Sequence, residues 1–392
     1  GTGQRAGRAA RCRVRPMRPF MTEALEAIAD RFHPREGIKA IRSLGSGNVN
    51  ETFLVTHEGQ DGAFVMQRLN TNVFDRPDLV MQNLQALGDH MERRLASPPP
   101  QLKGRRWEVP RVVPCRREAS PWIEQNGEFW RSITYIGAAT TSDVIRDSAH
   151  AQEVGYGLGM FHHLISDLPI NQLADTLENF HVTPAYLQHF DAVAKATDRL
   201  GPAERDACAF IEARRQGVDV LEAALSRGEL HHRPIHGDPK INNVMIDEAS
   251  GQAIGLIDLD TVKPGLVHYD IGDCVRSCCN PAGEETLCLD DVSFDMELCE
   301  AILTGYLSVA GGFLSDWDLH YLPHCIRLIP LELGLRFLTD HLEGDVYFRC
   351  DRPGHNLQRA LVQFRLTEAV EQQFNALEQL VARLKQQPSP NL

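Results

Sequence analysis

Hydrophobic and polar residues alternate with a period close to two in the first part of the chain, which is typical of half-buried strands. The alternation is clearest between residues 37 and 69, where two polar, glycine-containing turns separate the apolar runs. A helix is predicted from Asp75 and Pro77 to about Leu95, because proline suits the first turn of a helix. The strands are expected at residues 38–44, 49–55, 63–69, 111–115 and 129–136.

After Gly137 the spacing of apolar residues changes to that of helices. Val154, Leu158, Phe161 and Ile165 recur every three or four residues, which puts them on one helix face. Further helices are expected near residues 183–200, 203–228, 294–311, 320–343 and 356–385, with a short strand-rich island at 234–262. The pattern predicts an α+β chain, with a small antiparallel-sheet lobe at 21–137 and a larger, mainly helical lobe at 138–392.

The composition limits the classes of protein that are possible. Hydrophobic residues make up 43% of the 392 residues and charged residues 24%, which is usual for a globular chain. No apolar run is long enough to cross a bilayer, so we expect a soluble protein. The net charge of −13 makes nucleic acid or an anionic membrane surface an unsuitable partner.

The first twenty residues and the cysteines bear on processing and location. Residues 1–20 hold six arginines, no acid and no serine, whereas transit peptides are usually rich in serine. We interpret this stretch as an unstructured leader or start-site artefact and take Met21 as the natural start. The ten cysteines show no C-x-x-C spacing, and no signal peptide is evident, so reduced thiols in a cytoplasmic protein are expected.

The island at 234–262 contains the residues that phosphoryl transfer needs. Asp238 is followed five residues later by Asn243, and Asp258 and Asp260 follow a further apolar run. One carboxylate can accept the proton of an attacking hydroxyl, while an amide oxygen and a second carboxylate can hold Mg²⁺. Lys240 can neutralise charge on the transferred group. Either fragment alone would suit an ordinary turn, but both in this order favour catalysis.

These residues resemble those of a known family. His236-Gly-Asp with Asn243 and Ile257-Asp is similar to the aminoglycoside phosphotransferase/choline kinase family, which has a protein-kinase-like bilobal fold. Three motifs and the segment 335–363 resemble its N-acetylhexosamine 1-kinase branch: Gly45-Ser-Gly-Asn-Val-Asn-Glu-Thr-Phe, Gln67-Arg-Leu-Asn and Ile257-Asp-Leu-Asp-Thr-Val. The resemblance implies phosphorylation of the anomeric hydroxyl of an amino sugar, with ATP and Mg²⁺. It makes Asp238 the catalytic base, with Asn243 and Asp258 as metal ligands and Asp260 as a further candidate.

Two segments of the first lobe are candidates for nucleotide binding. The turn Gly45, Ser46, Gly47 and Asn48 lies between the first two expected strands, where backbone N–H groups can approach phosphates. The same turn would also suit a plain hairpin. Tyr135 and Ile136 end the last strand of the lobe and are the natural hinge against which adenine can bind.

The third strand departs from the pattern of many kinases. Strand alternation puts Val65 and Gln67 on one face and Met66 and Arg68 on the other, so Gln67 occupies the position expected for a lysine. We therefore expect no cation on this face of the strand. Phosphate charge would then fall on the metal, the glycine-rich turn and Lys240.

The acceptor is expected to bind beside the helix predicted at 320–343. Glu332, Arg336 and Asp340 are spaced by four and share one face, and Tyr347 follows. An exposed ladder of ion pairs is the alternative interpretation of this spacing. His236 is interpreted as a support of the catalytic loop, and the segment containing Asp270 and Asp273 as its organiser.

The sequence leaves rival functions open. A kinase of a cationic acceptor, such as an aminoglycoside or choline, is the close alternative to a sugar kinase. A catalytically weak nucleotide-binding regulatory protein is the alternative from another class. The oligomeric state has no signature in the sequence.

Overall fold

The computed structural model describes residues 19–44, 49–59 and 62–386, which form two compact units. The smaller unit contains the chain up to Met81 and the segment Pro110–Tyr135. The larger unit contains Gln82–Val109 and the chain from Ile136 onwards. The boundary between Tyr135 and Ile136 lies close to the division predicted at residue 137, whereas the membership of Gln82–Val109 in the larger unit was not anticipated.

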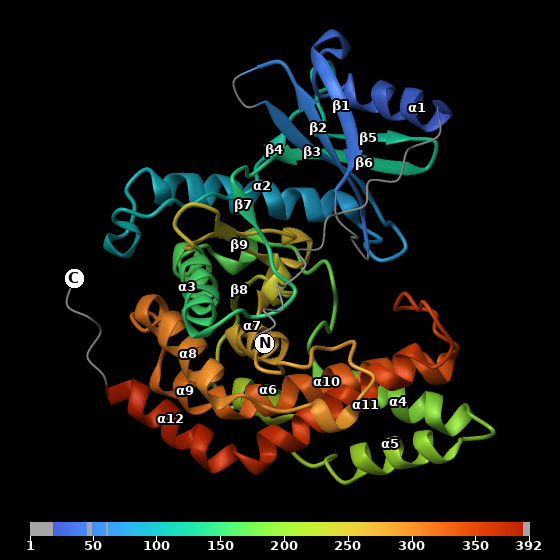
Figure 1. Cartoon of the computed structure of the whole chain (residues 1–392), viewed down its shortest axis with the longest axis vertical. Coiled ribbons are helices and arrows are strands. Elements are labelled where there is room, and N and C mark those ends of the chain that lie inside the picture. Colours follow the sequence, from blue (N-terminus) through green and yellow to red (C-terminus); the bar gives the residue numbers. More distant parts are fainter. Residues whose placement is uncertain (1–18, 45–48, 60–61, 387–392) are drawn as a thin grey trace, which may run out of the picture. The chain divides into compact units, whose positions relative to one another are not determined.

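The smaller unit is an antiparallel sheet with one covering helix (Figure 1). Its strands in the described residues have the order β1-β2-β3-β6-β4, and β5 also pairs with β6. The strands are β1 Ile38–Ser43, β2 Glu51–His57, β3 Ala63–Leu69, β4 Val112–Val113, β5 Trp122–Gln125 and β6 Glu128–Thr134, and the helix is α1 Pro19–Ala29. The predicted strands are present, but β5 and α1 were not predicted.

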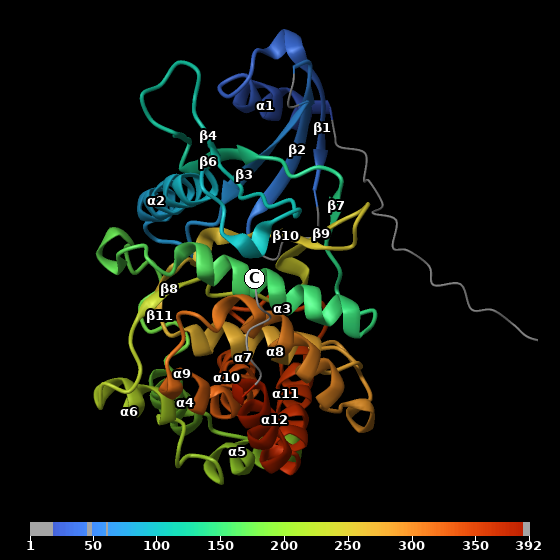
Figure 2. The same ribbon diagram turned by 90° about the vertical axis from the view of Figure 1, so that its left-hand side faces the viewer.

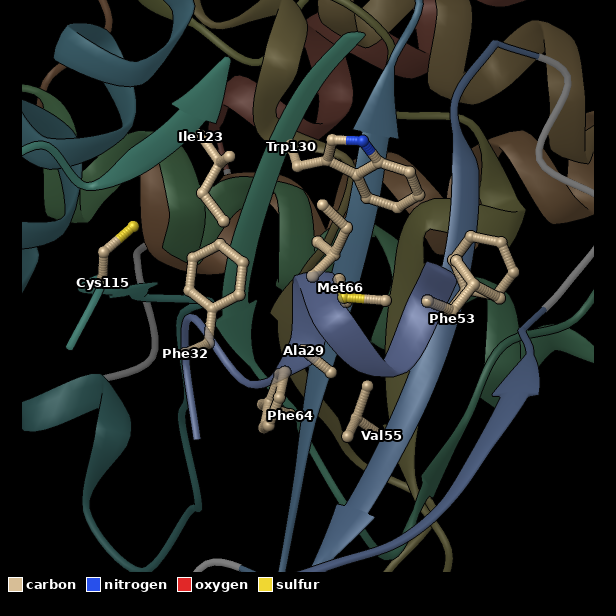
Figure 3. Packing of buried hydrophobic residues seen from close by; sticks show 11 residues of the cluster. Ala29, Phe32, Phe53, Val55, Phe64, Met66, Cys115, Ile123 and Trp130 are labelled. Atoms are coloured by element: carbon tan, nitrogen blue, oxygen red, sulfur yellow. The ribbon is translucent and has the colours of Figure 1, made fainter. Parts of the chain in front are cut away.

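Alternation along the strands puts the apolar core of the smaller unit on one face of the sheet. Met66 of β3 packs there with Phe53 of β2, Trp130 of β6 and Ala29 of α1 (Figure 3). Arg68 follows on the same face at the rim and pairs with Glu51 and Glu128. The predicted alternation of β3 is therefore confirmed, and Gln67 lies on the face opposite this core.

Helix α3 (Ser148–Ile165) is central to the larger unit. It packs against the hairpin of β9 (Val244–Asp247) and β10 (Ala253–Leu256) and against α8 (Met296–Ala310), and Figure 2 shows α3 between them. The other helices are α4 Thr183–Ala196, α5 Pro202–Glu212, α6 Val220–Ser226, α7 Val267–Cys278, α9 Asp316–His320, α10 Leu322–Glu343, α11 His355–Gln372 and α12 Phe374–Gln386. A short ladder joins β8 (Arg233–Ile235) to β11 (Lys263–Gly265), and β7 (Ala139–Thr140) pairs with β9.

Helix α2 (Pro77–Leu95) crosses the division between the units, which falls between Met81 and Gln82. Its buried Asn83 donates to the carbonyl oxygens of Ala174 and Val262, at 2.9 and 3.1 Å. Such bonds explain why Gln82–Val109 belongs to the larger unit. No helix in the described part of the chain is both long and apolar enough to span a membrane.

The fold class predicted from the sequence is confirmed, with an antiparallel-sheet unit and a mostly helical remainder. The helix expected at 203–228 is two helices, α5 and α6, and the one expected at 356–385 is α11 and α12. Helix α7 was not predicted.

Candidate active site

The loop after β8 is held in place by side chains of other segments, which form hydrogen bonds with its backbone. Asp270 of α7, which is fully buried, accepts from the backbone N–H of His236 at 2.7 Å and of Gly237 at 2.9 Å. The hydroxyl of Thr261 donates to the carbonyl oxygen of His236 at 2.7 Å. Gly237 has a φ of +90°, and a Cβ there would lie 2.5 Å from the Thr261 carbonyl oxygen, so glycine is required. The predicted role of Asp270 as organiser of this loop is confirmed.

The remaining backbone groups of the loop are also bonded. His181 lies with Nε2 2.7 Å from the carbonyl oxygen of Gly237, and the Asn243 amide donates to the carbonyl oxygen of Asp238 at 2.7 Å. The N–H of Asp238 donates to Nδ1 of His236 at 3.2 Å. All N–H and C=O groups of residues 236–238 thus have partners, which fixes the backbone that carries the Asp238 carboxylate.

His236 supports this loop from inside. Its Nδ1 accepts from Asp238, so its Nε2 carries the hydrogen and donates to the carbonyl oxygen of Ile257 at 2.9 Å. Burial lowers the pKa of His236, which keeps the ring neutral. Both ring nitrogens are occupied within the protein, and the interpretation of His236 as structural is therefore confirmed.

Asp238 and Lys240 form a pair at the open side of the loop. Nζ of Lys240 lies 3.1 Å from Oδ2 of Asp238, and their side chains are 33% and 30% exposed. The charge of Asp238 raises the pKa of Lys240, with smaller contributions from Asp258 and Asp273, so the lysine stays cationic. The pair offers a carboxylate that can accept a proton beside a cation that can neutralise a phosphoryl group.

Asn243 and Asp258 present the oxygen ligands that Mg²⁺ prefers. The amide nitrogen of Asn243 faces the Asp238 carbonyl, so the amide oxygen points away from it. Asp258 is exposed, with a left-handed backbone at φ 61°, directly before the short 3₁₀ turn Leu259–Thr261. Asp260 lies in that turn and is buried, at 2% exposure. The donor set fits Mg²⁺ held jointly with phosphate oxygens, with Asp258 as the more accessible carboxylate.

The described residues contain no group of three His, Cys, Asp or Glu side chains that could enclose a metal by themselves. A nucleotide-bound Mg²⁺ does not need such a cage, because it usually takes phosphate and water oxygens with one or two carboxylates.

In the smaller unit a cation does lie beside Gln67. The register pairs Gln67 with Arg131 of β6, and Oε1 of Gln67 accepts from Nε and Nη2 of Arg131 at 3.0 and 2.8 Å. Arg131 is 2% exposed and shares the sheet face opposite the apolar core. Strand β3 itself carries no cation on this face, as predicted, but a cation on the neighbouring strand was not expected. Strand β3 alone could not show it, because the guanidinium comes from the neighbouring strand.

The remaining candidates for nucleotide binding are the glycine-rich turn and the end of the last strand of the smaller unit. Gly45, Ser46, Gly47 and Asn48 lie outside the described residues. Tyr135 is 39% exposed and is the last residue of the smaller unit. Ile136 is the first of the larger unit and is buried against Met245 and Ile254.

Two of the acceptor candidates on α10 have carboxylates that already form hydrogen bonds within the protein. Glu332 is 1% exposed and accepts from Thr183, with His181 on its other oxygen. Asp340 is 3% exposed and accepts from the backbone N–H groups of residues 346, 347 and 348 at 2.7–2.9 Å. Neither carboxylate is open to an acceptor hydroxyl. The shared helix face was correctly predicted, but direct substrate contact by Glu332 and Asp340 is contradicted by their burial.

Arg336, between these two residues, lies among aromatic rings. Its guanidinium carbon is 4.9 to 5.9 Å from the ring centroids of four side chains, which we call the aromatic cluster: Phe180, Tyr186, Tyr347 and Phe348. Burial alone would lower the pKa of Arg336, but nearby Tyr186, Tyr347, Glu332 and Asp238 raise it. Tyr347 is 57% exposed. Among the acceptor candidates, Tyr347 is thus open to solvent, whereas Arg336 is partly buried and interacts electrostatically with Asp238.

Sequence comparison identifies the family of the chain, and structural comparison shows its fold. The model of the phosphotransferase enzyme family, APH, matches residues 40–308. An aminopropanol kinase associated with a microcompartment is 18% identical over 91% of this chain and 98% of its own, with a TM-score of 0.60. A choline kinase from Cryptosporidium parvum Iowa II is 14% identical over 92% and 97%, also with a TM-score of 0.60.

An aminoglycoside phosphotransferase from Alicyclobacillus acidocaldarius is 16% identical over 94% of this chain and 98% of its own, with a TM-score of 0.55. At these identities the solved structures show a shared fold, while the family model covers more than half of the chain. The chain therefore belongs to the phosphotransferase enzyme family and is an ATP-dependent small-molecule kinase with a protein-kinase-like fold.

Proposed function

We propose that this kinase transfers the γ-phosphoryl group of ATP to the anomeric hydroxyl of an N-acetylhexosamine. Asp238 accepts the proton of the attacking hydroxyl, and Lys240 neutralises charge on the phosphoryl group. Asn243 and Asp258 hold Mg²⁺, which when bound neutralises phosphate charge, and Asp260 supports the turn that carries Asp258. The fully bonded backbone of residues 236–238, which orients Asp238, is the observation that carries the catalytic assignment.

For the nucleotide we propose contributions from Gly45, Ser46, Gly47 and Asn48, from Gln67, and from the backbone of Tyr135 and Ile136. Arg131 joins this set because its guanidinium bonds directly to Gln67. It supplies a positive charge at the place where many kinases use a strand lysine.

The acceptor assignment rests on Arg336 and the aromatic cluster. Aromatic faces are where proteins usually bind a substituted ammonium group, but here the guanidinium of Arg336 already lies over them. A planar cation with several N–H donors suits hydroxyl, carbonyl or anionic groups of a substrate. This arrangement supports a neutral sugar derivative, recognised by Arg336 and Tyr347.

A kinase of a cationic acceptor is the second candidate. Its support is that the similar solved structures include proteins described as aminopropanol, choline and ethanolamine kinases. A catalytically weak regulatory protein is less favoured, because Asp238, Asn243 and Asp258 are all present and Arg131 supplies the cation that the third strand lacks.

The test is ADP release from Mg·ATP across a panel of N-acetylhexosamines, free hexoses, choline, ethanolamine and kanamycin. We expect turnover of an N-acetylhexosamine, with the product phosphate coupled to the C1 proton in the ³¹P spectrum. A phosphate on another carbon would contradict the anomeric assignment. Turnover of an amine alone would favour the second candidate.

Asp238→Asn is the matched dead variant for this panel. It removes the proton acceptor and keeps the shape, so turnover should be abolished while Mg·ATP still binds in a calorimetric titration. Near-normal turnover by Asp238→Asn would contradict the assignment of the base.

A further inference from the structure

His181 connects helix α10 to the loop that carries Asp238. Its Nδ1 lies 2.8 Å from Oε1 of Glu332, and its Nε2 lies 2.7 Å from the carbonyl oxygen of Gly237. Thr183 donates to the second oxygen of Glu332 at 2.8 Å. His181 is 4% exposed and Glu332 1%, so water does not replace these bonds. Helix α10 thus reaches the peptide before Asp238 through one imidazole ring.

The partners of His181 define its protonation state. A carboxylate and a carbonyl oxygen can only accept hydrogen bonds, so both ring nitrogens must donate, and the ring is an imidazolium. Burial alone would lower the pKa of His181, but the charge and hydrogen bond of Glu332 outweigh burial and raise it. His162 differs, because one of its nitrogens meets the Tyr306 hydroxyl, which can itself donate.

The surroundings of the ring suit a cation. Glu332 faces it from α10, and the charge of Asp273 on α7 acts in the same direction. The ring of Tyr269, also on α7, stacks on it with centroids 5.5 Å apart. On α4 the Tyr186 hydroxyl accepts from the backbone N–H of His181 at 3.4 Å. Arg336, whose pKa the charge of Glu332 helps to raise, lies one helical turn beyond Glu332 on α10.

The backbone before α4 is bent so that neighbouring residues contact both Arg336 and Gly237. Asn179 and His181 both have left-handed conformations, with φ of 60° and 64°. Non-glycine residues adopt this region at a cost and are often found at functional sites. The bend directs the Phe180 ring to the guanidinium of Arg336, at 5.3 Å, and His181 to Gly237. One tripeptide therefore touches both the aromatic cluster and the catalytic loop.

We propose that His181, held as a cation by Glu332, is a positioning residue that fixes the Gly237–Asp238 peptide and couples it to the acceptor-binding aromatic cluster. The inference rests on the proposed role of Asp238 as the base. Without the bond from His181, the Gly237 carbonyl would be a buried acceptor with no partner, and the peptide would rotate to find one. The Asp238 carboxylate would then leave its productive position.

His181→Asn is the variant that isolates this contact. Asparagine tolerates the left-handed backbone but is too short to bridge Glu332 and Gly237. We expect kcat to fall about a hundredfold, as small displacements of catalytic groups do, with the KM for ATP unchanged. His189→Asn is the control, because His189 also pairs with a glutamate, Glu343, at 3.0 Å, but on the surface. It should leave kcat unaltered.

Glu332→Gln tests the charge state at nearly constant volume. The imidazole then has no carboxylate to keep it cationic, although Nε2 can still donate to Gly237 when the ring is neutral. Above its raised pKa the wild-type ring keeps one proton, which the Glu332 carboxylate draws to Nδ1, so Gly237 loses its donor and kcat should fall on the alkaline side. In Glu332→Gln the amide can donate to Nδ1 and leave the proton of the neutral ring on Nε2, so this alkaline limb should disappear, with a smaller loss of kcat at neutral pH than in His181→Asn.

Two-dimensional ¹H–¹⁵N spectra of histidine-labelled protein give a test that needs no turnover. The His181 ring, identified by its loss in His181→Asn, should show two protonated nitrogens at pH 7.5 in the wild type and one in Glu332→Gln. A neutral ring in the wild type, or a folded His181→Asn enzyme with wild-type kcat, would overturn the inference. If no acceptor is phosphorylated by the wild type, the proposed function fails, and the spectra still decide the state of His181.

Discussion

Asp258 adopts a left-handed backbone conformation, which few residues other than glycine, asparagine and aspartate accept easily. Its φ of 61° directs the chain from β10 into the Leu259–Thr261 turn, and an unfavourable conformation of this kind often accompanies function. Asp258→Asn keeps this backbone accessible and removes only the charge. We expect kcat to fall and the Mg²⁺ concentration for half-maximal rate to rise, since a metal ligand acts in the ground and transition states.

The measurement is the rate at saturating acceptor as a function of free Mg²⁺. Asp260→Asn is the companion variant, because Asp260 is buried in the same turn. An unchanged Mg²⁺ requirement in Asp258→Asn, with an altered one in Asp260→Asn, would move the metal ligand to Asp260.

At the residue scale, residues that are close in sequence are also close in the structure. The sequence offset of Asp238 and Asn243 translates directly into a bond between neighbours in one loop. Glu332 and Asp340 were placed on the correct helix face, yet their partners come from segments distant in sequence, such as Thr183. Spacing within one helix carries no information on those partners, so it could not separate a buried support from an open ligand.

At the scale of elements, the crossing of α3 and α8 depends on glycine. A Cβ at Gly155 would lie 2.0 Å from the backbone oxygen of Ile302, and a Cβ at Gly305 would lie 2.0 Å from that of Gln152. Because backbone cannot move aside as a side chain can, Gly155→Ala should destabilise the larger unit by about 1–3 kcal/mol. Urea unfolding measures this, and Gly312→Ala, which has open space around it, is the control. Equal midpoints for the two variants would contradict the close crossing.

The segment after α10 is a second element with a clear dependence on one residue. Asp340 binds three successive backbone N–H groups, of residues 346–348, and so presents Tyr347. Asp340→Asn replaces one acceptor oxygen with an amide that also donates, so one of these bonds must be lost. We expect the acceptor KM to rise severalfold with the ATP KM unchanged. A rise in both values, or in neither, would argue against a role for this segment in acceptor binding.

Helices were predicted from the sequence where apolar spacing is long and regular, and α7 was missed for a physical reason. Asp270, Gly272 and Asp273 form helices poorly, and their presence is explained by tertiary contacts. Gly272 allows α10 to approach, since a Cβ there would lie 2.8 Å from the Cys325 carbonyl oxygen. Asp270 accepts hydrogen bonds from the backbone N–H groups of His236 and Gly237 in the loop after β8. Local propensity is overridden by contacts that only the folded unit contains.

At the scale of the whole molecule, two units could be expected from the change of pattern near residue 137. The assignment of Gln82–Val109 to the larger unit could not, because it depends on single side chains within it. Asn83 reaches Val262, and Arg105 pairs with Glu153 at 2.8 Å. Neither bond can be recognised from the spacing of apolar residues in this segment.

The charge of the whole chain and the charge at the acceptor candidates have opposite signs. A net charge of −13 favours the approach of cationic molecules in general, but Arg336 puts a fixed positive charge near Asp238. Short-range recognition should dominate, because a site built on directional donors penalises a substrate that cannot accept from them. We therefore expect choline and kanamycin to be turned over poorly at any ionic strength, and the hexosamine rate to be insensitive to salt.

Arg336→Ala tests this balance. It removes the donor from the aromatic cluster, so the hexosamine KM should rise about tenfold or more, as for a lost hydrogen bond to a charged group, while the ATP KM stays near its original value. Arg349→Ala is the matched control, since Arg349 is an exposed arginine of the following segment that pairs only loosely with Asp351, at 3.4 Å. Removing the guanidinium also uncovers aromatic faces, so choline should bind better to Arg336→Ala than to the wild type. Unaltered sugar kinetics in Arg336→Ala, or turnover of a polyamine by the wild type, would show that the acceptor is recognised elsewhere.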